Sequence, residues 1–566
     1  MLDETPATSP FLTGLYEPVL QEIDAHDLAV SGTIPEALSG VYMRNGANPQ
    51  FSPLGRYHWF DGDGMVHAVY LDGGRARYKN RWIETPGLRH ERKVGSALFG
   101  GILNFVFPPE DLLAECGIFK NAANTNIVAH AGKYLGLWEG GFPTEITREL
   151  ETVGLHDYGG KLIGAMTAHP KWCTETGELM FFGYDPVAGP PFLRYHVADR
   201  AGNLTHSTPI ELPRGVMMHD FLTTRNHSLF FDLPAVISAV MAGEEMFQPA
   251  LGARIGVIPR HGTNSDVRWF DIDPCYVFHF LNAWEDGDVI TAYGCRMPGI
   301  DLDFEARTDE AGSLAATKGV GLAKWTIDLA AGTCREAIVH DLRSDFPRLH
   351  DDLLGLKHRF GYASATVDGP MSLGLNALIR YDLETGAEQV LRFGEGTAIG
   401  EAVFAADPTA TGETAGWLLV YATDLATLRT DLCIVDGRDF SGGPVARVHL
   451  PQRVPAGFHG QLATPVTPTG RRALLLPALA GRFLGCLLVA LRSPFLLQRL
   501  PGLLRLGCAF LFFGHSAPYG MNRPRNVLHP SRLQLVGKPA RMDLLPLRVT
   551  SLMLALIVSH ARTWQS

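Results

Sequence analysis

Through residues 1–468 the chain alternates short apolar runs with turn-forming residues. Typical runs are GKYLGLWEG, TGELMFFGYDP, NHSLFFDLP, GDVITAYGC and AGWLLVYATD. Each is rich in aromatic, Val, Leu and Ile residues and is bounded by Gly, Asn, Asp or Pro, which is typical of β-strands. Helical periodicity is scarce and is best in two short segments, 109–119 and 234–243. Many short strands at regular spacing predict an all-β protein, and the length of 566 residues favours a propeller over one sandwich.

The composition changes abruptly near residue 469. Residues 469–566 hold 12 Arg and one Lys but a single acidic residue, whereas the whole chain carries a net charge of −10. We therefore expect an N-terminal arm over 1–24, a propeller domain over 25–468 and a basic, apolar C-terminal extension over 469–566. The apolar clusters of the extension are interrupted or shorter than the roughly 20 residues that span a membrane. Two interpretations stay open: a membrane-associated extension, or a stretch never selected to fold, such as a shifted reading frame.

The remaining composition narrows the class of protein. The net acidic charge gives no reason to expect nucleic acid as a partner. The eight Cys are too sparse for a disulfide framework and form no Cys-x-x-Cys pair. The acidic start, MLDETPATSPF, lacks the basic and apolar regions of a secretory signal. These features predict a cytoplasmic protein of a reducing compartment.

Seven polar residues stand in strand-like apolar contexts, where a buried imidazole or carboxylate needs a polar partner. The histidines are His169 in MTAHPKW, His219 in GVMMHDF, His279 in YVFHFLNAWE and His459 in RVPAGFHG. The carboxylates are Glu139 in LGLWEGG, Asp345 in RSDFPRL and Glu401 in IGEAVF.

The spacing of six of these residues is informative. Positions 169, 219, 279, 345, 401 and 459 are separated by 50, 60, 66, 56 and 58 residues, a nearly constant period that averages 58. Such a period is typical of propeller blades with insertions, and about 430 residues correspond to about seven blades. Because the innermost strands of a propeller line one axis, one polar residue per blade would converge there.

A single divalent metal is the object best able to hold several buried imidazoles together. Scattered core histidines are the alternative. Imidazole suits Fe, Zn, Cu and Ni, so the type of ligand does not choose the metal. The carboxylates then fit one step further out, where each accepts the other ring N–H of a histidine and fixes its orientation.

The segments around these residues resemble the carotenoid cleavage oxygenases, a family of non-haem iron enzymes. The matching series is HWFDGDGMVHAV (58–69), YKNRWIET (78–85), NTNIVAHAGKYLGLWEGG (124–141), TAHPK (167–171), MMHDF (217–221), FHFLNAWE (278–285), DFPR (345–348), GEAVF (400–404) and RVPAGFHG (453–460). Together these segments cover about residues 25–460. The resemblance implies a seven-bladed β-propeller with a dome of loops and helices over the iron face.

The resemblance also implies roles for the site residues. His169, His219, His279 and His459 match the four ligands of Fe²⁺ in that family. Glu139 and Glu401 match glutamates that hold these ligands. Asp345 stands where many relatives carry Glu, so its shorter side chain needs a bridging water or a small backbone shift.

The activity implied by the resemblance is insertion of O₂ across a conjugated C=C bond of a carotenoid or apocarotenoid, which gives two carbonyl products. Four histidine ligands leave open positions for O₂ beside the metal. Three alternatives remain: a dioxygenase for stilbenoids, an isomerohydrolase on the same iron centre, and a metal-free binding propeller. Stilbenoid-cleaving relatives typically place Lys just before the first of these glutamates. Trp138 stands there in this chain, which favours a polyene over a phenolate; a plain core residue is the alternative.

The segment 96–107, SALFGGILNFVF, is a candidate for contact with a membrane. It fits an interfacial segment, and relatives use an apolar patch in this region to reach lipophilic substrates. The basic residues HERK (90–93) just upstream could lie at anionic headgroups. A buried helix or loop is the alternative. The partners that we expect are therefore a lipophilic polyene, O₂ and, peripherally, a membrane.

Overall fold

The structure is a computed structural model that describes residues 9–464, apart from 103, 105, 107, 118, 187–188, 303–319 and 368–373. The chain divides into two units, Met1–Gly470 and Arg471–Ser566. All of the described residues belong to the first unit. The extension predicted over 469–566, with both of its interpretations, falls outside the described residues.

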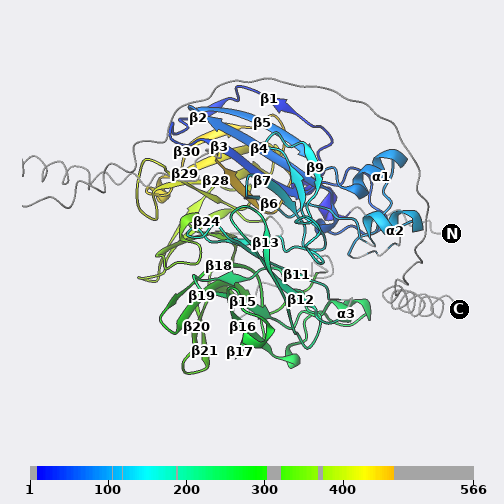
Figure 1. The fold of residues 1–566 in the computed structure, drawn as a ribbon. Helices are drawn as coiled ribbons and strands as arrows, with labels where there is room; N and C mark the ends of the chain where they lie inside the picture. The colour runs from blue at the N-terminus through cyan, green and yellow to red at the C-terminus, as the bar shows by residue number, and fades with distance from the viewer. Residues whose placement is uncertain are drawn as a thin grey trace, which may run out of the picture. The chain divides into compact units, whose positions relative to one another are not determined.

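The strands of the first unit form seven antiparallel sheets, five of which have four strands in chain order (Figure 1). The first of these five consists of β6 (Asn126–His130), β7 (Lys133–Leu137), β8 (Thr144–Ile146) and β9 (Thr152–Leu155). The second consists of β10 (Lys171–Trp172), β11 (Leu179–Tyr184), β12 (Leu193–Ala198) and β13 (Leu204–Ile210). The next consists of β14 (Leu222–Thr223), β15 (His227–Asp232), β16 (Ala253–Pro259) and β17 (Arg268–Ile272). The fourth consists of β18 (Tyr276–Asp286), β19 (Val289–Met297), β20 (Gly321–Asp328) and β21 (Thr333–His340). The fifth consists of β22 (Ser344–Arg348), β23 (Phe360–Ala365), β24 (Ala377–Asp382) and β25 (Ala387–Arg392).

The other two sheets join the two ends of the propeller. One runs in the order β1-β5-β4-β3-β31, and its strands are β1 (Asp24–Ala25), β3 (Gly40–Ala47), β4 (Gly64–Asp72), β5 (Arg75–Trp82) and β31 (Gly460–Ala463). The other contains β2 (Val30–Gly32), β26 (Thr397–Ile399), β27 (Val403–Ala406), β28 (Gly416–Asp424), β29 (Thr430–Asp436) and β30 (Pro444–His449). Because β31 pairs with β3 and β2 pairs with β30, each end of the chain completes a blade begun by the other. The predicted seven-bladed β-propeller is confirmed.

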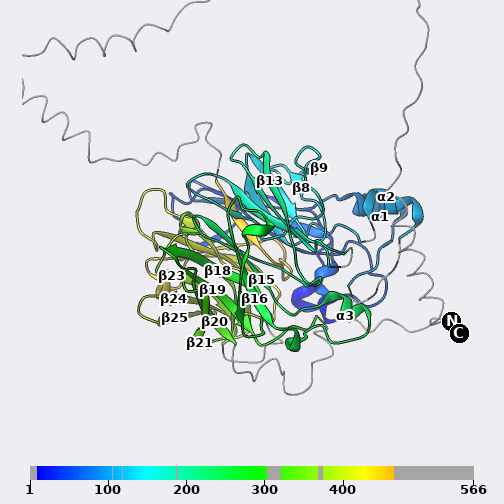
Figure 2. The same ribbon diagram turned by 60° about the horizontal axis from the view of Figure 1, so that its bottom comes forward.

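The described residues contain three short α-helices. They lie on one side of the sheets, as Figures 1 and 2 both show. They are α1 (Pro86–Val94), α2 (Glu110–Cys116) and α3 (Ile237–Met241). The helices expected over 109–119 and 234–243 correspond to α2 and α3. Helix α1 was missed, although its ends carry ordinary signals: the Thr85 side chain caps its start before a Pro, and Gly95 ends it in a left-handed conformation with φ of 82°.

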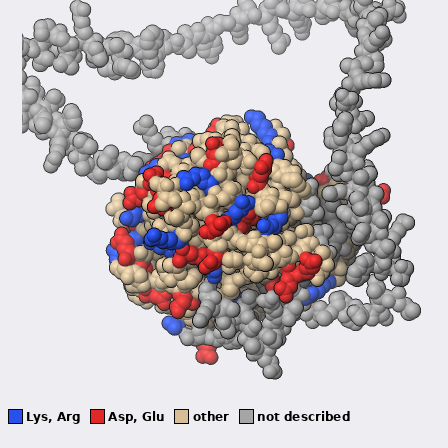
Figure 3. Space-filling view, turned by 90° about the horizontal axis from the view of Figure 1, so that it is seen from below, with Lys and Arg blue, Asp and Glu red and all other residues tan. Residues whose placement is uncertain are grey.

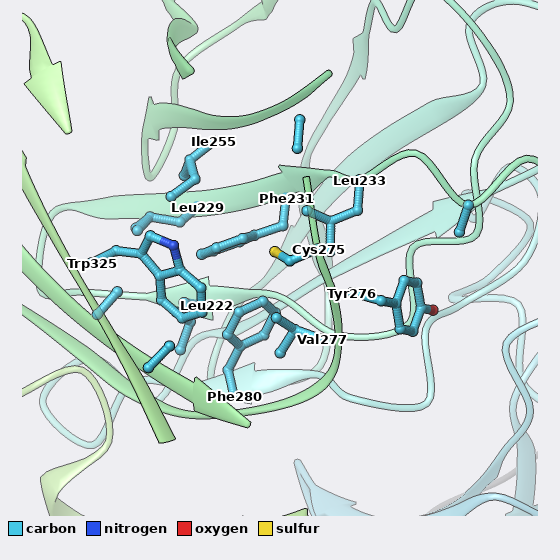
Figure 4. Packing of buried hydrophobic residues seen from close by; sticks show 14 of the residues in the cluster. Leu222, Leu229, Phe231, Leu233, Ile255, Cys275, Tyr276, Val277, Phe280 and Trp325 are labelled. Atoms are coloured by element: carbon cyan, nitrogen blue, oxygen red, sulfur yellow. The ribbon is translucent and has the colours of Figure 1, made fainter. Parts of the chain in front are cut away.

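The space between two blades is filled by large apolar side chains (Figure 4). Phe231 of β15 lies 4.2 Å from Phe280 of β18 and 5.3 Å from Trp325 of β20, measured between ring centroids. All three side chains are at most 4% exposed. Aromatic rings of this size contribute most of the apolar area that is buried on folding. The cohesion between these two blades therefore comes from apolar packing.

Charged side chains are spread over the surface in Figure 3, which views the molecule from below. Acidic and basic groups intermingle on the described part of this face rather than gathering by sign. Ion pairs also occur among exposed side chains, such as Arg225 with Glu175 at 2.9 Å. Exposed ion pairs of this kind contribute little to the stability of the fold.

Candidate metal centre

The periodic residues of the sequence lie in or close to the first strands of the blades. His169 lies two residues before β10, His219 lies three residues before β14, and His279 lies within β18. Asp345 lies in β22, and Glu401 lies between β26 and β27. His459 directly precedes β31, the strand that completes the N-terminal blade. The average period of 58 residues is therefore the distance along the chain from one innermost strand to the next.

Hydrogen bonds near these residues connect every neighbouring pair of blades into a closed circle. They are Asn126 Nδ2 to the Ala168 carbonyl (2.7 Å), Thr167 Oγ1 to the His219 carbonyl (3.2 Å), the Phe280 amide to Asp220 Oδ2 (2.9 Å), His279 Nδ1 with Asp345 Oδ1 (2.7 Å), Arg348 Nη1 to Glu401 Oε1 (3.3 Å), His459 Nδ1 with Glu401 Oε1 (3.0 Å) and the Ala129 amide to Gln461 Oε1 (2.8 Å). We call this circle the inner ring. It fixes the innermost strands relative to one another.

Four histidines converge within the inner ring. His169, His219, His279 and His459 each offer one ring nitrogen, and these nitrogens lie within 4.8 Å of one another. The Nε2 atoms of His169 and His219 are 3.0 Å apart, and the His169 and His459 ring centroids are 4.4 Å apart. All four side chains are buried. The structure thus brings together the four histidines that the sequence singled out.

Each of three histidines is held by a carboxylate on its Nδ1 atom. Glu139 Oε2 lies 2.5 Å from Nδ1 of His219, and Glu401 Oε1 lies 3.0 Å from Nδ1 of His459. Asp345 Oδ1 lies 2.7 Å from Nδ1 of His279. A carboxylate accepts the Nδ1 proton, so the Nε2 lone pair of each ring remains free to face the common centre. All three carboxylates predicted from the sequence are in this arrangement.

Asp345 reaches His279 without a bridging water, despite its shorter side chain. The pairing register between β22 and β23 shifts between Asp345 and Arg348. Phe346, inside this irregularity, has a left-handed backbone with φ of 53°, and its amide donates to Asp345 Oδ1 at 2.8 Å. These contacts hold the Asp345 carboxylate against His279.

His169 is positioned differently. No carboxylate of the described residues pairs with its ring. Two residues further on, however, Lys171 forms a 2.7 Å ion pair with Asp220, the residue after His219. The other oxygen of Asp220 accepts the amide of Phe280, the residue after His279, at 2.9 Å. This buried pair therefore fixes the strands of three histidines relative to one another.

The electrostatics of the centre favour neutral rings at His169 and His459 and an ionised Glu401. Burial, together with the neighbouring rings, lowers the pKa of His169 well below its ordinary value. Burial also lowers the pKa of His459 to about 4. Burial also opposes protonation of His219, but Glu139 outweighs it and raises the pKa of His219. Burial opposes ionisation of Glu401, but Arg348 and His459 outweigh it and hold the pKa of Glu401 at about 2. Neutral histidine is the form that binds a metal.

The donor set fits a metal ion. The buried Nε2 atom of His279 has no hydrogen-bond partner among the described residues, although an unpaired buried nitrogen is costly. The Nε2 atoms of His169 and His219 also lie 3.0 Å apart. Because Glu139 holds the proton of His219 on Nδ1, its Nε2 atom presents a lone pair to the centre. One cation placed among the four nitrogens would satisfy them all. His169, His219, His279 and His459 are thus the residues that would hold it.

Cavities approach the centre from two directions. A cavity of about 80 Å³ touches His169, His279 and His459, and its mixed polar and apolar lining includes Lys171, Asp220 and Arg348. A larger cavity of about 250 Å³ is lined by apolar and aromatic side chains together with Asp345 and Glu401. We call this second one the apolar cavity. Among its lining residues are Leu15, Trp59, Phe346, Leu375 and Phe458.

Trp138 lines a third cavity, next to the predicted membrane segment. Its ring is half-buried, and Phe60, Phe99 and Ile102 line the same cavity. The ring of Phe60 lies 5.6 Å from that of Phe458, which lines the apolar cavity. The two cavities therefore share an aromatic wall. Trp138 is in the surroundings of the site and does not contact the histidines.

Sequence reasoning missed several residues that complete the centre. Lys171, Asp220 and Arg348 stand beside predicted site residues, but nothing in their local pattern shows whom they contact. Tyr184 of β11 donates to Glu139 Oε1 at 2.8 Å and so orients the carboxylate that holds His219. For Lys171, Asp220 and Arg348, the available signal was a charged residue within three positions of a predicted site residue. Tyr184 had no such signal.

A seven-bladed propeller with four buried histidines on its axis defines a class of metal-binding propeller proteins. The chain belongs to the carotenoid cleavage oxygenase family, since a sequence model described as retinal pigment epithelial membrane protein matches residues 16–464. A carotenoid cleavage oxygenase of Mycobacterium tuberculosis is 36% identical over 510 residues, which cover 80% of this chain and 97% of that protein. An isoeugenol monooxygenase of Pseudomonas nitroreducens is 35% identical over 471 residues, with 80% and 97% covered.

The fold also matches solved structures. The lignostilbene dioxygenase of Pseudomonas brassicacearum superposes with a TM-score of 0.73 at 27% sequence identity, and the match covers 82% of this chain and all of that one. The predicted family is confirmed. Its named members act on both polyene and phenolic compounds, so substrate class must be argued from the site.

Proposed function

We propose that this protein is an Fe²⁺-dependent dioxygenase that cleaves a conjugated C=C bond of a carotenoid or apocarotenoid with O₂, giving two carbonyl products. The cluster of four buried histidine nitrogens within 4.8 Å of one another carries the proposal. Relatives named carotenoid cleavage oxygenase and carotenoid 9,10(9',10')-cleavage dioxygenase support the substrate class. The iron ion would activate O₂, the hard step for an alkene that has no acidic proton or leaving group.

The residues of the chain supply orientation and an apolar environment. Glu139, Asp345 and Glu401 keep the Nδ1 protons of three histidines in place, so that the opposite nitrogens face the metal. The Lys171–Asp220 pair holds the spacing of their strands. The aromatic wall beside the centre positions the polyene and excludes water from the reacting bond.

A phenolic alkene is the second candidate substrate class. The isoeugenol and lignostilbene relatives favour it. Against it, the side chain just before Glu139 is Trp138, which cannot form an ion pair with a phenolate. The half-buried indole faces a cavity that also holds Phe60 and Phe99 and suits an apolar chain. We therefore place the polyene first.

Peripheral contact with a membrane is part of the proposal. Two exposed apolar side chains line the Trp138 cavity: Ile102 at 43% and Phe119 at 47% exposure. Val94, at 63% exposure, ends α1 and follows Arg92 and Lys93 in its last turn. Over the described residues no helix is long and apolar enough to cross a bilayer. Apolar side chains beside basic ones suit shallow insertion at anionic headgroups.

The test is metal analysis combined with turnover. We expect the full chain, purified anaerobically with iron, to hold one iron per molecule and to bleach an apocarotenal in an O₂-dependent reaction. Both carbonyl products should carry one atom from ¹⁸O₂. His219→Ala should abolish metal binding and bleaching together. It removes one of the four ligands, and one of the three that remain is His169, whose ring no carboxylate of the described residues orients.

Other outcomes would overturn parts of the proposal. Iron binding with cleavage of 4-hydroxystilbenes but not of polyenes would assign the phenolic substrate class. Products without oxygen from O₂ would indicate an isomerohydrolase. Absence of bound metal under iron-replete conditions would contradict the central claim.

A further inference from the structure

The first described residues, 9–17, form a segment beside the apolar cavity that we call the leading segment. It contains two short 3₁₀ turns, Pro10–Leu12 and Gly14–Tyr16, and none of its residues belongs to a strand of the seven sheets. Leu15 and Tyr16 of the second turn are half-buried, and both side chains line the apolar cavity. A segment from outside the blades therefore forms part of the cavity wall.

Hydrogen bonds hold the leading segment on the part of the chain just before His459. The Ala456 amide donates to the Leu15 carbonyl at 3.0 Å. The Arg453 guanidinium donates to the Gly14 carbonyl at 2.9 Å. Ala456 and Arg453 precede the histidine by three and six residues. These bonds therefore fix the position of Leu15 relative to the metal centre.

Aromatic contacts connect the leading segment with the same part of the site. The Tyr16 ring meets the Trp59 ring edge-on, with 5.2 Å between their centroids. Trp59 in turn lies 4.6 Å from the ring of Phe458, the residue directly before His459. All three aromatic residues line the apolar cavity. Aromatic pairs of this kind hold their geometry firmly, so the leading segment is a built part of this wall.

The Leu15 side chain extends toward two other blades. Its Cδ2 atom lies 4.0 Å from the point that a Cβ on Gly374 would occupy, and the Cβ of Ala398 is equally close to that point. Gly374 lies three residues before β24, and Ala398 lies in β26. Both residues line the apolar cavity. The bulk of Leu15 therefore limits the space between the leading segment and these blades.

The metal end of the same cavity is marked by Phe346 and Glu401. The Phe346 ring stacks on His279 at 5.1 Å between centroids, and Glu401 holds His459 at 3.0 Å. A polyene whose reacting bond lies at the metal must pass these residues. A conjugated chain is stiff, so the part beyond the metal has to fit the space that Leu15 limits.

We propose that Leu15 determines which double bond of a polyene lies at the metal, because it limits how far the chain reaches into the apolar cavity. The inference rests on the proposed function and deepens it, since it assigns the choice of bond to a residue outside the blades. The cavity of about 250 Å³ is several times the roughly 30 Å³ share of one water molecule, so it has room for part of a chain.

The experiment compares the cleavage products of the iron-loaded wild type and of Leu15→Ala on one apocarotenal. The smaller side chain lets the polyene enter further. We therefore expect a second pair of carbonyl products, from cleavage one conjugated double bond closer to the end that stays outside the cavity. Chromatography with mass detection identifies both pairs. Leu12→Ala is the matched control, because Leu12 is half-buried in the same segment and does not line this cavity.

Leu15→Phe tests the opposite direction. The larger side chain shortens the cavity, so kcat/KM should fall about tenfold for the longest polyene that the wild type cleaves and stay within about twofold for the shortest. Equal losses for all chain lengths would contradict a limit on length.

Binding is measured separately from turnover, by quenching of tryptophan fluorescence under anaerobic conditions with apocarotenals of increasing length. The length that binds best should increase in Leu15→Ala and decrease in Leu15→Phe. If Leu15→Ala gives the same products and the same best length as Leu12→Ala, the inference is wrong, although cleavage itself would leave the proposed function intact. If the best length changes with the residue at position 15 but no variant cleaves a polyene, the proposed function fails and the limit on length stands.

Discussion

The inner ring and the spaces between the blades are built from opposite kinds of side chain. In the inner ring, imidazoles and carboxylates meet through hydrogen bonds that connect all seven blades. Between the blades of β15 and β18, Phe231, Phe280 and Trp325 pack through their aromatic rings. The change happens within one strand: His279 belongs to the ring, and Phe280 beside it belongs to the apolar packing.

This difference teaches that stability and chemistry are carried by separate sets of residues. Apolar burial supplies most of the free energy of folding, whereas a polar network mainly fixes geometry. Substitutions between the blades should therefore weaken the fold and spare metal affinity. Substitutions in the inner ring should do the reverse.

The largest effect is expected between the blades. Trp325→Ala removes a fully buried ring that contacts Phe231 and Phe280, and should lower the free energy of unfolding by about 3–5 kcal/mol. Urea titration measures this loss, and iron affinity of the protein that stays folded should equal that of the wild type. A parallel fall in iron affinity would show that the inter-blade residues and the metal site are not separate.

Glu401→Gln should lower iron affinity by roughly 10- to 100-fold, because His459 loses an ionised acceptor on Nδ1. Competition with a chelator measures the affinity. The matched control is Glu388→Gln, since Glu388 pairs with Nδ1 of His340 at 3.1 Å on an outer strand. Equal effects of the two substitutions would show that the loss is not specific to the ring.

Asp220→Asn tests the pair that orders three of the histidine strands. Loss of the charge leaves Lys171 unpaired but keeps an acceptor for the Phe280 amide, so iron affinity should fall about tenfold. Asp232→Asn, which breaks a comparable 2.8 Å pair with Arg254, is the control. An unchanged affinity in Asp220→Asn would limit the Lys171–Asp220 pair to a structural role.

The smallest effect concerns a polar ring in the inter-blade region. Burial lowers the pKa of His358 to about 4, so the unfolded chain, with an ordinary pKa near 6.5, binds this proton first as pH falls. His358 should therefore cost about 1 kcal/mol of stability between pH 6.5 and pH 5.5. His358→Gln should flatten the pH dependence of the unfolding free energy by that amount. An unchanged slope would mean that His358 is not neutral in the folded protein.

The repeat could be predicted from the sequence because it is a property of local pattern. The average period of 58 residues marked positions in or beside the first strands of six of the seven blades. Contacts between distant residues could not be predicted in this way. Lys171 and Asp220 lie 49 positions apart, and only the packed blades show that they form a pair. The pairing of β31 with β3 was hidden for the same reason.

Asp345 shows a second limit of the sequence. The pairing register between β22 and β23 shifts between Asp345 and Arg348, and no residue pattern predicted this irregularity.

The pairing of β31 with β3 has a consequence for how the protein is made. The strand that closes the propeller directly follows His459, the last of the four histidines in chain order. During translation, the first three histidines leave the ribosome long before the fourth, and the N-terminal blade waits for its innermost strand. Closure of the propeller and completion of the metal centre are therefore one event. A partly synthesised chain offers no four-histidine site, and iron captured early would have to be held by an open assembly.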